Sequence, residues 1–324
     1  MNIYNVTDII YLNRFLIGLL LLAVLGSELD ASRLTVNQEL SNLFNEFWTL
    51  DVNRMQPGVD YSILVQGKAG YVSQGSNVAR DRASQPLFSN VNETKLGLIP
   101  TFSRFLTLLD NYEMSTGVAE RISPEEVAEN NLFLDAVMET EVMKRAQRYL
   151  VGKGKSSANA RQFRSQLYLI WFQLYHRERN AGMDSSGFEH VFVGETKSGT
   201  EIIGFHNWLQ FYLQEKHGHL DYKGYKAREQ DIPDQDDHVL NLQFSWHGLV
   251  KPVGSAFVGA SPEFEMALFT VVFLMNTQRS TAVLVNIDQC QMELVVIRHG
   301  RSLGTAYPRL LSSNSRHLLR SPAQ

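Results

Sequence analysis

Apolar residues in the first half of the chain recur at intervals of three and four, the spacing of an amphipathic helix. Four stretches show this pattern, at 40–48, 102–109, 123–150 and 163–174. Thr35 and Gln38 stand in capping-box positions before the first stretch. The third begins with Ser123, Pro124 and Glu126 in the N-cap, N1 and N3 positions. We therefore expect helices whose aromatic stripes face the core and are not base-stacking platforms.

The apolar pattern changes to a period of two in the second half, which indicates strands. The expected strands lie at 188–193, 201–205, 240–246, 281–287 and 292–298. The first two are joined through a turn that contains Gly199, which is typical of a hairpin, and the last two form a second hairpin. Ser261 and Pro262 mark the start of one helix in this half.

Helices that come early and strands that come late predict an α+β fold, because βαβ units would alternate the two along the chain. We expect one domain at 33–308, with a helical part at about 33–180 and a part of mostly antiparallel strands at about 181–308. The polar stretch 60–92 predicts a long loop or a short hairpin. The basic end, 309–324, is expected to be a disordered tail.

An apolar run at 15–26 follows Arg14 near the start of the chain. The run is too short to cross a bilayer as a helix, so we interpret residues 1–26 as a signal peptide and expect secretion. An uncleaved membrane anchor is the alternative. The sequon that begins at Asn92 is compatible with a secreted glycoprotein.

The overall composition is that of a globular protein, with 44% hydrophobic and 20% charged residues. A formal net charge of −4 argues against a broad basic surface for duplex DNA. Any contact with RNA should therefore be a local cationic pocket. Cys290 is the only cysteine, so no intramolecular disulfide can form, and we expect its side chain to be buried.

Two of the nine histidines occupy unusual positions in this pattern. His190 lies within one expected strand and His206 closes the next, so a hairpin would bring the two imidazoles side by side. Such a pair can divide the roles of general base and general acid. Lys251 follows an expected strand and could stabilise charge in phosphoryl transfer. From spacing alone, a structural histidine pair and a surface lysine remain the commoner explanations.

A second group of polar residues could instead bind a metal. His217 and His219 could ligate it from an extended segment, and carboxylates could supply oxygen ligands. The candidate carboxylates are Asp231, Asp234, Asp236 and Asp237. A solvated loop is the commoner explanation for this composition.

Several longer motifs resemble the EndoU family, the poly(U)-specific endoribonucleases. They lie at 51–54, 56–58, 184–195, 204–212, 221–225, 246–259, 261–265 and 304–308. The resemblance extends from about residue 40 to residue 308. It implies the EndoU fold, with the catalytic residues in the strand-rich part.

The resemblance also implies roles for individual residues. The family's catalytic histidines and lysine correspond to His190, His206 and Lys251, and its essential glutamates to Glu189 and Glu195. The residues on the uridine side are Thr305 and Tyr307. Family members often need Mn²⁺, although the metal ligands are not identified by the sequence.

The activity implied is cleavage of single-stranded RNA at uridylates by a monomeric enzyme. The 2′-hydroxyl would attack the adjacent phosphorus and leave 2′,3′-cyclic phosphate and 5′-hydroxyl ends, so DNA would not react. We assign His190 as base and His206 as acid, an assignment that the sequence does not fix. The alternatives are an RNA-binding protein of the same fold, a metal-dependent phosphodiesterase, and a secreted interaction module.

Overall fold

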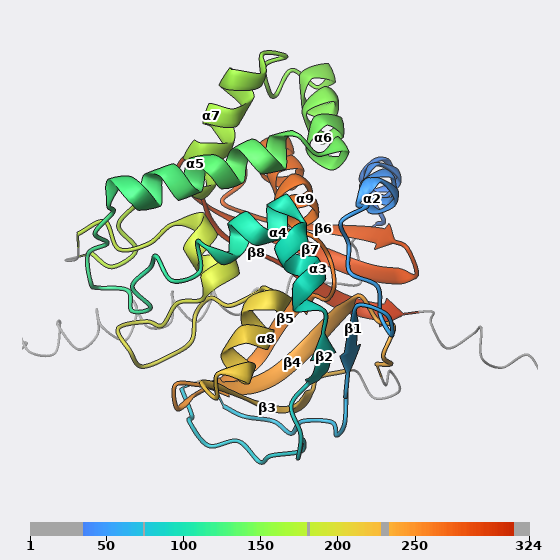
Figure 1. Cartoon of the computed structure of the whole chain (residues 1–324), viewed down its shortest axis with the longest axis vertical. Helices are drawn as coiled ribbons and strands as arrows, with labels where there is room; N and C mark the ends of the chain where they lie inside the picture. The colour runs from blue at the N-terminus through green and yellow to red at the C-terminus, as the bar shows by residue number, and fades with distance from the viewer. Residues whose placement is uncertain (1–34, 74, 180–181, 228–232, 314–324) are drawn as a thin grey trace, which may run out of the picture. The chain divides into compact units, whose positions relative to one another are not determined.

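Helices dominate the chain up to residue 171 and strands dominate beyond residue 220 in the computed structural model (Figure 1). The structure describes residues 35–73, 75–179, 182–227 and 233–313. This arrangement confirms the expected α+β class. No helix in these ranges has the length and apolar character needed to cross a membrane. The proposed signal peptide and most of the expected tail lie outside the described residues.

The four stretches with helical spacing all contain helices, with shifted ends. The helices of the first half are α2 (Gln38–Leu50), α3 (Glu93–Leu98), α4 (Pro100–Leu106), α5 (Pro124–Met138), α6 (Glu141–Gly152) and α7 (Ala160–Trp171). The short helix α3 was not predicted. The single helix expected at 123–150 is wrong, because Thr140 caps a new helix by accepting from the backbone N–H of Met143. Asn37 caps α2 in place of Thr35, and the Ser123 capping box is present as expected.

The strands form three antiparallel sheets. A small sheet pairs β1 (Tyr61–Ile63) with β2 (Phe88–Val91). The second has β3 (Leu220–Tyr225), β4 (Val239–Trp246) and β5 (Leu249–Phe257) in that order. The third has β6 (Ser280–Ile287), β7 (Cys290–His299) and β8 (Ser302–Ser313). The hairpin at 281–298 is confirmed. The tail prediction is wrong for residues 309–313, because they continue β8 and pair with β7.

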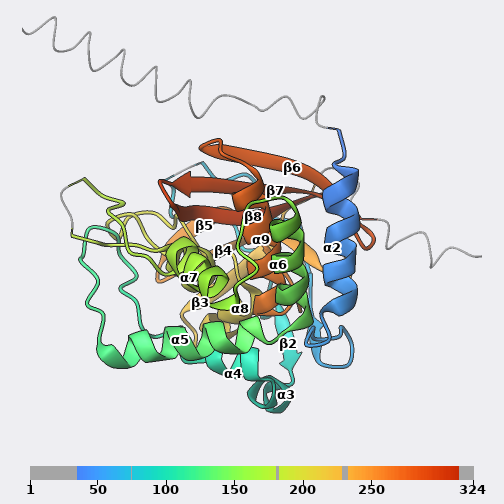
Figure 2. The ribbon, with the colours of Figure 1, turned by 90° about the horizontal axis from the view of Figure 1, so that it is seen from above.

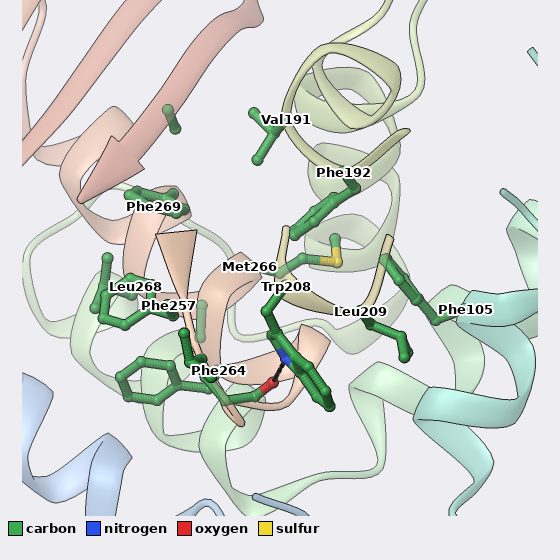
Figure 3. Packing of buried hydrophobic residues seen from close by; sticks show 14 of the residues in the cluster. Phe105, Val191, Phe192, Trp208, Leu209, Phe257, Phe264, Met266, Leu268 and Phe269 are labelled. Carbon is green, nitrogen blue, oxygen red and sulfur yellow. Dashed lines mark hydrogen bonds between the residues drawn. The ribbon is translucent and has the colours of Figure 1, made fainter. Parts of the chain in front are cut away.

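Helix α9 (Pro262–Met275) is the buried centre of the molecule and contacts α2, α4, α6 and β7 (Figure 2). Helix α8 (Trp208–Lys216) is anchored beside it, since Trp208 Nε1 donates to the carbonyl oxygen of Ala260 at 2.9 Å (Figure 3). Phe192 and Met266 pack in the same cluster. His206, two residues before α8, is therefore attached to the buried core around α9.

Candidate active site

His190 lies on a short helical segment, Glu189–Val193, and the strand expected at 188–193 is wrong. The cause is a local capping box, which competes with the strand-like apolar pattern. Ser186 Oγ accepts from the backbone N–H of Glu189, and a side-chain oxygen of Glu189 accepts from the backbone N–H of Ser186. The expected hairpin is reduced to an isolated bridge between Thr196 and Ile202.

Two glycines allow the chain to return from this segment to His206. Gly194 has a φ of +105°, which favours glycine, and a Cβ at Gly204 would collide with the carbonyl oxygen of His190. The close approach lets the backbone N–H of Phe205 donate to His190 at 3.0 Å. The N–H of His206 donates to Val191 at 2.8 Å. Backbone hydrogen bonds therefore fix the two histidines relative to each other.

The two imidazoles lie side by side, with their ring centres 6.2 Å apart. Both are almost fully buried, at 4% exposure for His190 and 6% for His206. In each ring Nδ1 is held by the protein, and Nε2 makes no hydrogen bond to a described residue. The two Nε2 atoms are therefore the positions at which a substrate could exchange protons with this pair.

His190 is held by a carboxylate. Its Nδ1 lies 2.6 Å from Glu195 Oε2, and Arg177 Nε lies 3.0 Å from the same oxygen. Ser185 donates its hydroxyl to the other oxygen of Glu195. Burial raises the pKa of Glu195 to about 7, while Arg177 and Ser185 oppose this shift and favour the carboxylate. Burial, with the cations Arg177 and Lys251, holds the pKa of His190 well below its usual value.

His206 has a neutral partner. Its Nδ1 lies 3.1 Å from the carbonyl oxygen of Ser255, which can only accept, so this nitrogen carries the proton. Burial, together with Lys251 and His190, lowers the pKa of His206 well below its usual value. One face of the ring is covered by Tyr307, at 4.8 Å between ring centres and 19° between planes.

Lys251 completes the cluster from β5. Its ammonium donates to the carbonyl oxygen of Ile202 at 2.9 Å. Burial lowers the pKa of Lys251 to about 8, which leaves the side chain mostly charged at neutral pH. The charge of Lys251 lowers the pKa values of both His190 and His206, so the ammonium lies close to both imidazoles.

Thr305 and Tyr307 lie on the same face of β8, opposite Ile297 and Val295 of β7. Tyr307 contacts His206, so this face of the strand borders the histidine pair. Thr305 Oγ1 makes no hydrogen bond within the described part of the chain. The structure therefore places Tyr307 at the edge of the site, and Thr305, whose Oγ1 is buried, two residues away on the same face of β8.

The two glutamates at the site have different surroundings. Glu195 contacts His190 directly, whereas Glu189 bonds to Ser186 and is fully buried in the helical segment. Burial, with the charges of Glu195 and Glu120, raises the pKa of Glu189 well above its usual value. Glu195 is thus placed to orient an imidazole, and Glu189 to hold the backbone that carries His190.

The comparisons with known proteins agree on one family. A family model described as Endoribonuclease XendoU matches residues 39–308. The chain belongs to the XendoU family of endoribonucleases. It is 69% identical to uridylate-specific endoribonuclease C of Danio rerio over 289 residues, which cover 89% of this chain and 94% of that protein.

Two further XendoU relatives support the assignment. The chain is 60% identical to the poly(U)-specific endoribonuclease of Xenopus tropicalis, with coverage of 86% of this chain and 96% of that protein. The solved structure described as "The structure of XendoU: a splicing independent snoRNA processing endoribonuclease" matches with a TM-score of 0.78 and 56% identity. That match covers 86% of this chain and 100% of the other.

Sequence reasoning missed Arg177 in this XendoU site. Its guanidinium contacts Glu195 and Ser185, and also donates to the carbonyl oxygen of Gly304 at 2.8 Å, next to Thr305. Arg177 thereby joins the partner of His190 to the strand of the uridine-side residues. No periodic pattern marks it, because it lies in a loop after α7.

The described residues contain no group of three or more His, Cys, Asp or Glu side chains arranged to hold a metal ion. His217 and His219 lie in the exposed turn after α8, where His219 stacks on His247 at 5.0 Å. Asp231 lies outside the described residues. Glu195 is already engaged by His190, Arg177 and Ser185. Among the described residues, these side chains therefore do not fit a protein-held Mn²⁺.

Proposed function

We propose that this chain cleaves single-stranded RNA after uridylates by transesterification through the 2′-hydroxyl. The observation that carries the proposal is the pair of buried imidazoles with both Nδ1 atoms held and both Nε2 atoms free. Two positioned nitrogen bases can remove one proton and deliver another in a single displacement. A phosphodiester fits this pair because it loses one oxygen substituent while it gains another.

In the first half of the step, His190 acts as the base. With Glu195 as carboxylate, Nδ1 of His190 carries the proton, so Nε2 can accept the proton of the uridine 2′-hydroxyl. The 2′-oxygen then forms a bond to the adjacent phosphorus. Glu195 stabilises the imidazolium that results, which favours His190 for this role over His206.

In the second half, His206 acts as the acid. In its protonated form Nε2 donates a proton to the 5′-oxygen as the bond from phosphorus to that oxygen breaks. The products are a 2′,3′-cyclic phosphate and a 5′-hydroxyl end, which makes the reaction lyase-type. Lys251 offsets the charge that develops on the non-bridging oxygens. DNA has no 2′-hydroxyl and would not react.

The preference for uridine is supported by the site and by the relatives. Tyr307 can contact the base or the sugar, and Thr305, on the same face of β8, carries a hydroxyl of the kind that bonds a base edge. The Danio rerio and Xenopus tropicalis proteins are named for uridylate and poly(U) specificity. Because a paired uracil hides its edge, the substrate is single-stranded.

The test is end-group analysis of a defined oligonucleotide that contains one uridine, with Mn²⁺ and with EDTA. We expect a cyclic phosphate on the uridine fragment and a 5′-hydroxyl on the other. A 5′-phosphate end together with complete loss of cutting in EDTA would favour the metal-dependent phosphodiesterase. If wild type and His206→Ala bind the oligonucleotide alike and neither cuts, the chain is an RNA-binding protein of the same fold.

A substrate with a bridging 5′-sulfur separates the two histidine roles, because a thiolate leaves without a proton from the enzyme. The His206→Ala variant should recover cleavage on this substrate and His190→Ala should not. The reverse outcome would exchange the base and acid assignments.

We also propose that the chain is secreted as a monomeric glycoprotein. In addition, we propose that Mn²⁺ stimulates cleavage through the RNA phosphates. Asn92 is exposed where it caps α3, which suits attachment of a glycan. Secretion and glycosylation are tested by expression in secretory cells. The medium fraction is then analysed by N-terminal sequencing and glycosidase treatment. Retention of the full chain in the membrane fraction would favour the uncleaved anchor.

A further inference from the structure

Asn207, the residue after His206, uses both ends of its side chain in a buried setting. Its Oδ1 accepts from the backbone N–H groups of Leu209 at 3.0 Å and Gln210 at 3.1 Å, and so caps α8. Its Nδ2 donates to Glu265 Oε1 at 3.1 Å. Asn207 is 2% exposed and Glu265 is fully buried, so this hydrogen bond is shielded from bulk solvent.

The position of Asn207 decides where the His206 ring lies. The backbone of Asn207 forms a bridge with Phe257 of β5, two residues beyond the carbonyl group of Ser255 that binds His206 Nδ1. A shift of Asn207 relative to β5 therefore changes the distance from Nδ1 to that carbonyl oxygen. The hydrogen bond fixes which nitrogen carries the proton, so it also fixes the state of Nε2.

Glu265 is a rigid attachment point for Asn207. It lies in the first turn of α9, whose side chains are buried almost throughout. Its other oxygen, Oε2, makes no hydrogen bond to a described residue. A buried carboxyl group with a single partner is costly to keep, which favours a role beyond packing.

We propose that Glu265 and Asn207 are positioning residues for His206, and hold its imidazole so that Nε2 faces the scissile phosphate. Glu265 fixes Asn207, Asn207 fixes the start of α8 and the bridge to β5, and these two contacts fix the ring. The inference rests on the function proposed above, in which His206 is the general acid. It assigns no contact with the substrate to either residue.

A polarity exchange tests the pair. Asn207→Asp keeps the helix cap, but it exchanges the Nδ2 donor for an oxygen and so places a second carboxyl group against the buried Glu265. We expect kcat to fall about 100-fold, the order of loss for a displaced catalytic group, with KM nearly unchanged. Glu265→Gln keeps an acceptor for Asn207 and should stay near the wild-type value.

The double variant Asn207→Asp, Glu265→Gln restores one donor and one acceptor in reversed order. It should recover kcat to within about threefold of wild type. The exchange keeps one donor facing one acceptor, so the interaction between the two side chains is preserved. Asn159→Asp, the same change at the N-cap of α7, is the matched control and should leave kcat unchanged.

Two readouts separate positioning from general destabilisation. With the 5′-sulfur substrate the loss in Asn207→Asp should largely disappear, since this substrate needs no acid. Nitrogen NMR of the imidazole reports the tautomer without any need for activity. We expect the Nδ1–H form of His206 in wild type and in the double variant, and a mixture of forms in Asn207→Asp.

Three results would overturn the proposal. They are a wild-type kcat in Asn207→Asp, a double variant no better than Asn207→Asp, and an unchanged His206 tautomer in that single variant. If wild type itself does not cut, the proposed function fails, and the tautomer measurement still decides whether Asn207 and Glu265 position the ring.

Discussion

At the scale of single residues, the two histidines differ mainly in the group that binds Nδ1. His190 faces a carboxylate from Glu195, whereas His206 faces the carbonyl oxygen of Ser255. A negative partner stabilises an imidazolium ion more than a neutral one does. The asymmetry between two otherwise similar rings thus follows from their partners, and it supports the separate roles proposed for them.

Glu195→Gln should lower kcat about 100-fold or more, because the amide removes the charge and permits the wrong tautomer of His190. KM should change little, since Glu195 does not contact the substrate. Steady-state kinetics on a single-uridine oligonucleotide measure both constants. Glu46→Gln, an exposed glutamate paired with Arg145, is the control. A variant with wild-type kcat would show that the carboxylate does not support the base.

The pH dependence of cleavage follows from the lowered pKa values of both histidines. The base must be neutral, so activity is lost below its pKa, and the acid must be protonated, so activity is lost above its pKa. For the free enzyme, kcat/KM should therefore peak on the acidic side of pH 7.

Bound phosphate raises both pKa values by its negative charge, so kcat should peak at a higher pH than kcat/KM. Because the pKa of Lys251 is about 8, a further decline is expected above pH 8. Initial rates across the pH range in buffers of constant ionic strength measure both profiles. A maximum of kcat/KM above pH 8 would contradict two depressed histidines.

At the scale of elements, the site depends on how closely the 189–193 segment approaches the chain at Gly204. Gly204→Ala would force the backbone away from the carbonyl oxygen of His190. We expect a loss of about 2 kcal/mol or more in the free energy of unfolding, with a large fall in kcat. Thermal and denaturant unfolding with steady-state kinetics measure the two effects.

Gly97→Ala is the matched control for this substitution. Gly97 lies within α3, and a Cβ there meets no atom within 4 Å. Alanine in place of a helical glycine should leave stability unchanged or raise it by up to about 1 kcal/mol. If both variants behave alike, the close approach at Gly204 does not constrain the site.

The elements also show where sequence reasoning succeeds. Regular spacing marks α2, α5 and α7 and the β6–β7 hairpin, because each buries one face or stripe. The strand predicted at 188–193 is wrong because this stretch is buried on all sides and its apolar run lacks a helical period. The Ser186–Glu189 capping box was the available signal for a helix there.

At the scale of the whole molecule, the residues of the site come from distant parts of the chain. The family motifs point to His190, His206, Lys251, Thr305 and Tyr307. The structure brings the two histidines, Lys251 and Tyr307 together, and Thr305 lies on the same face of β8 as Tyr307. Arg177 and Ser255 could not be predicted, because one acts through a loop contact and the other through its backbone carbonyl group. Such contacts depend on tertiary packing and leave no local pattern.

The molecule also keeps buried carboxyl groups at the start of α9, which makes its stability depend on pH. Burial and the charge of Glu263 raise the pKa of Asp51 to about 7, and burial raises those of Glu263 and Glu265. A raised pKa means that the folded state binds the proton more tightly than the unfolded state. This contribution is complete below the unfolded pKa and is lost as pH rises towards 7.

Asp51→Asn removes that contribution and keeps an oxygen for the backbone N–H of Ser261, which Asp51 accepts at 3.2 Å. At pH 8 the variant should be more stable than wild type by about 1–2 kcal/mol, while at pH 5 the two should be nearly equal. The depressed pKa values of His190 and His206 give a slope of opposite sign, but they are common to both proteins and cancel in the difference. Urea unfolding of the pair at both pH values measures it, and a difference that does not grow with pH would show that Asp51 is ionised in the folded state.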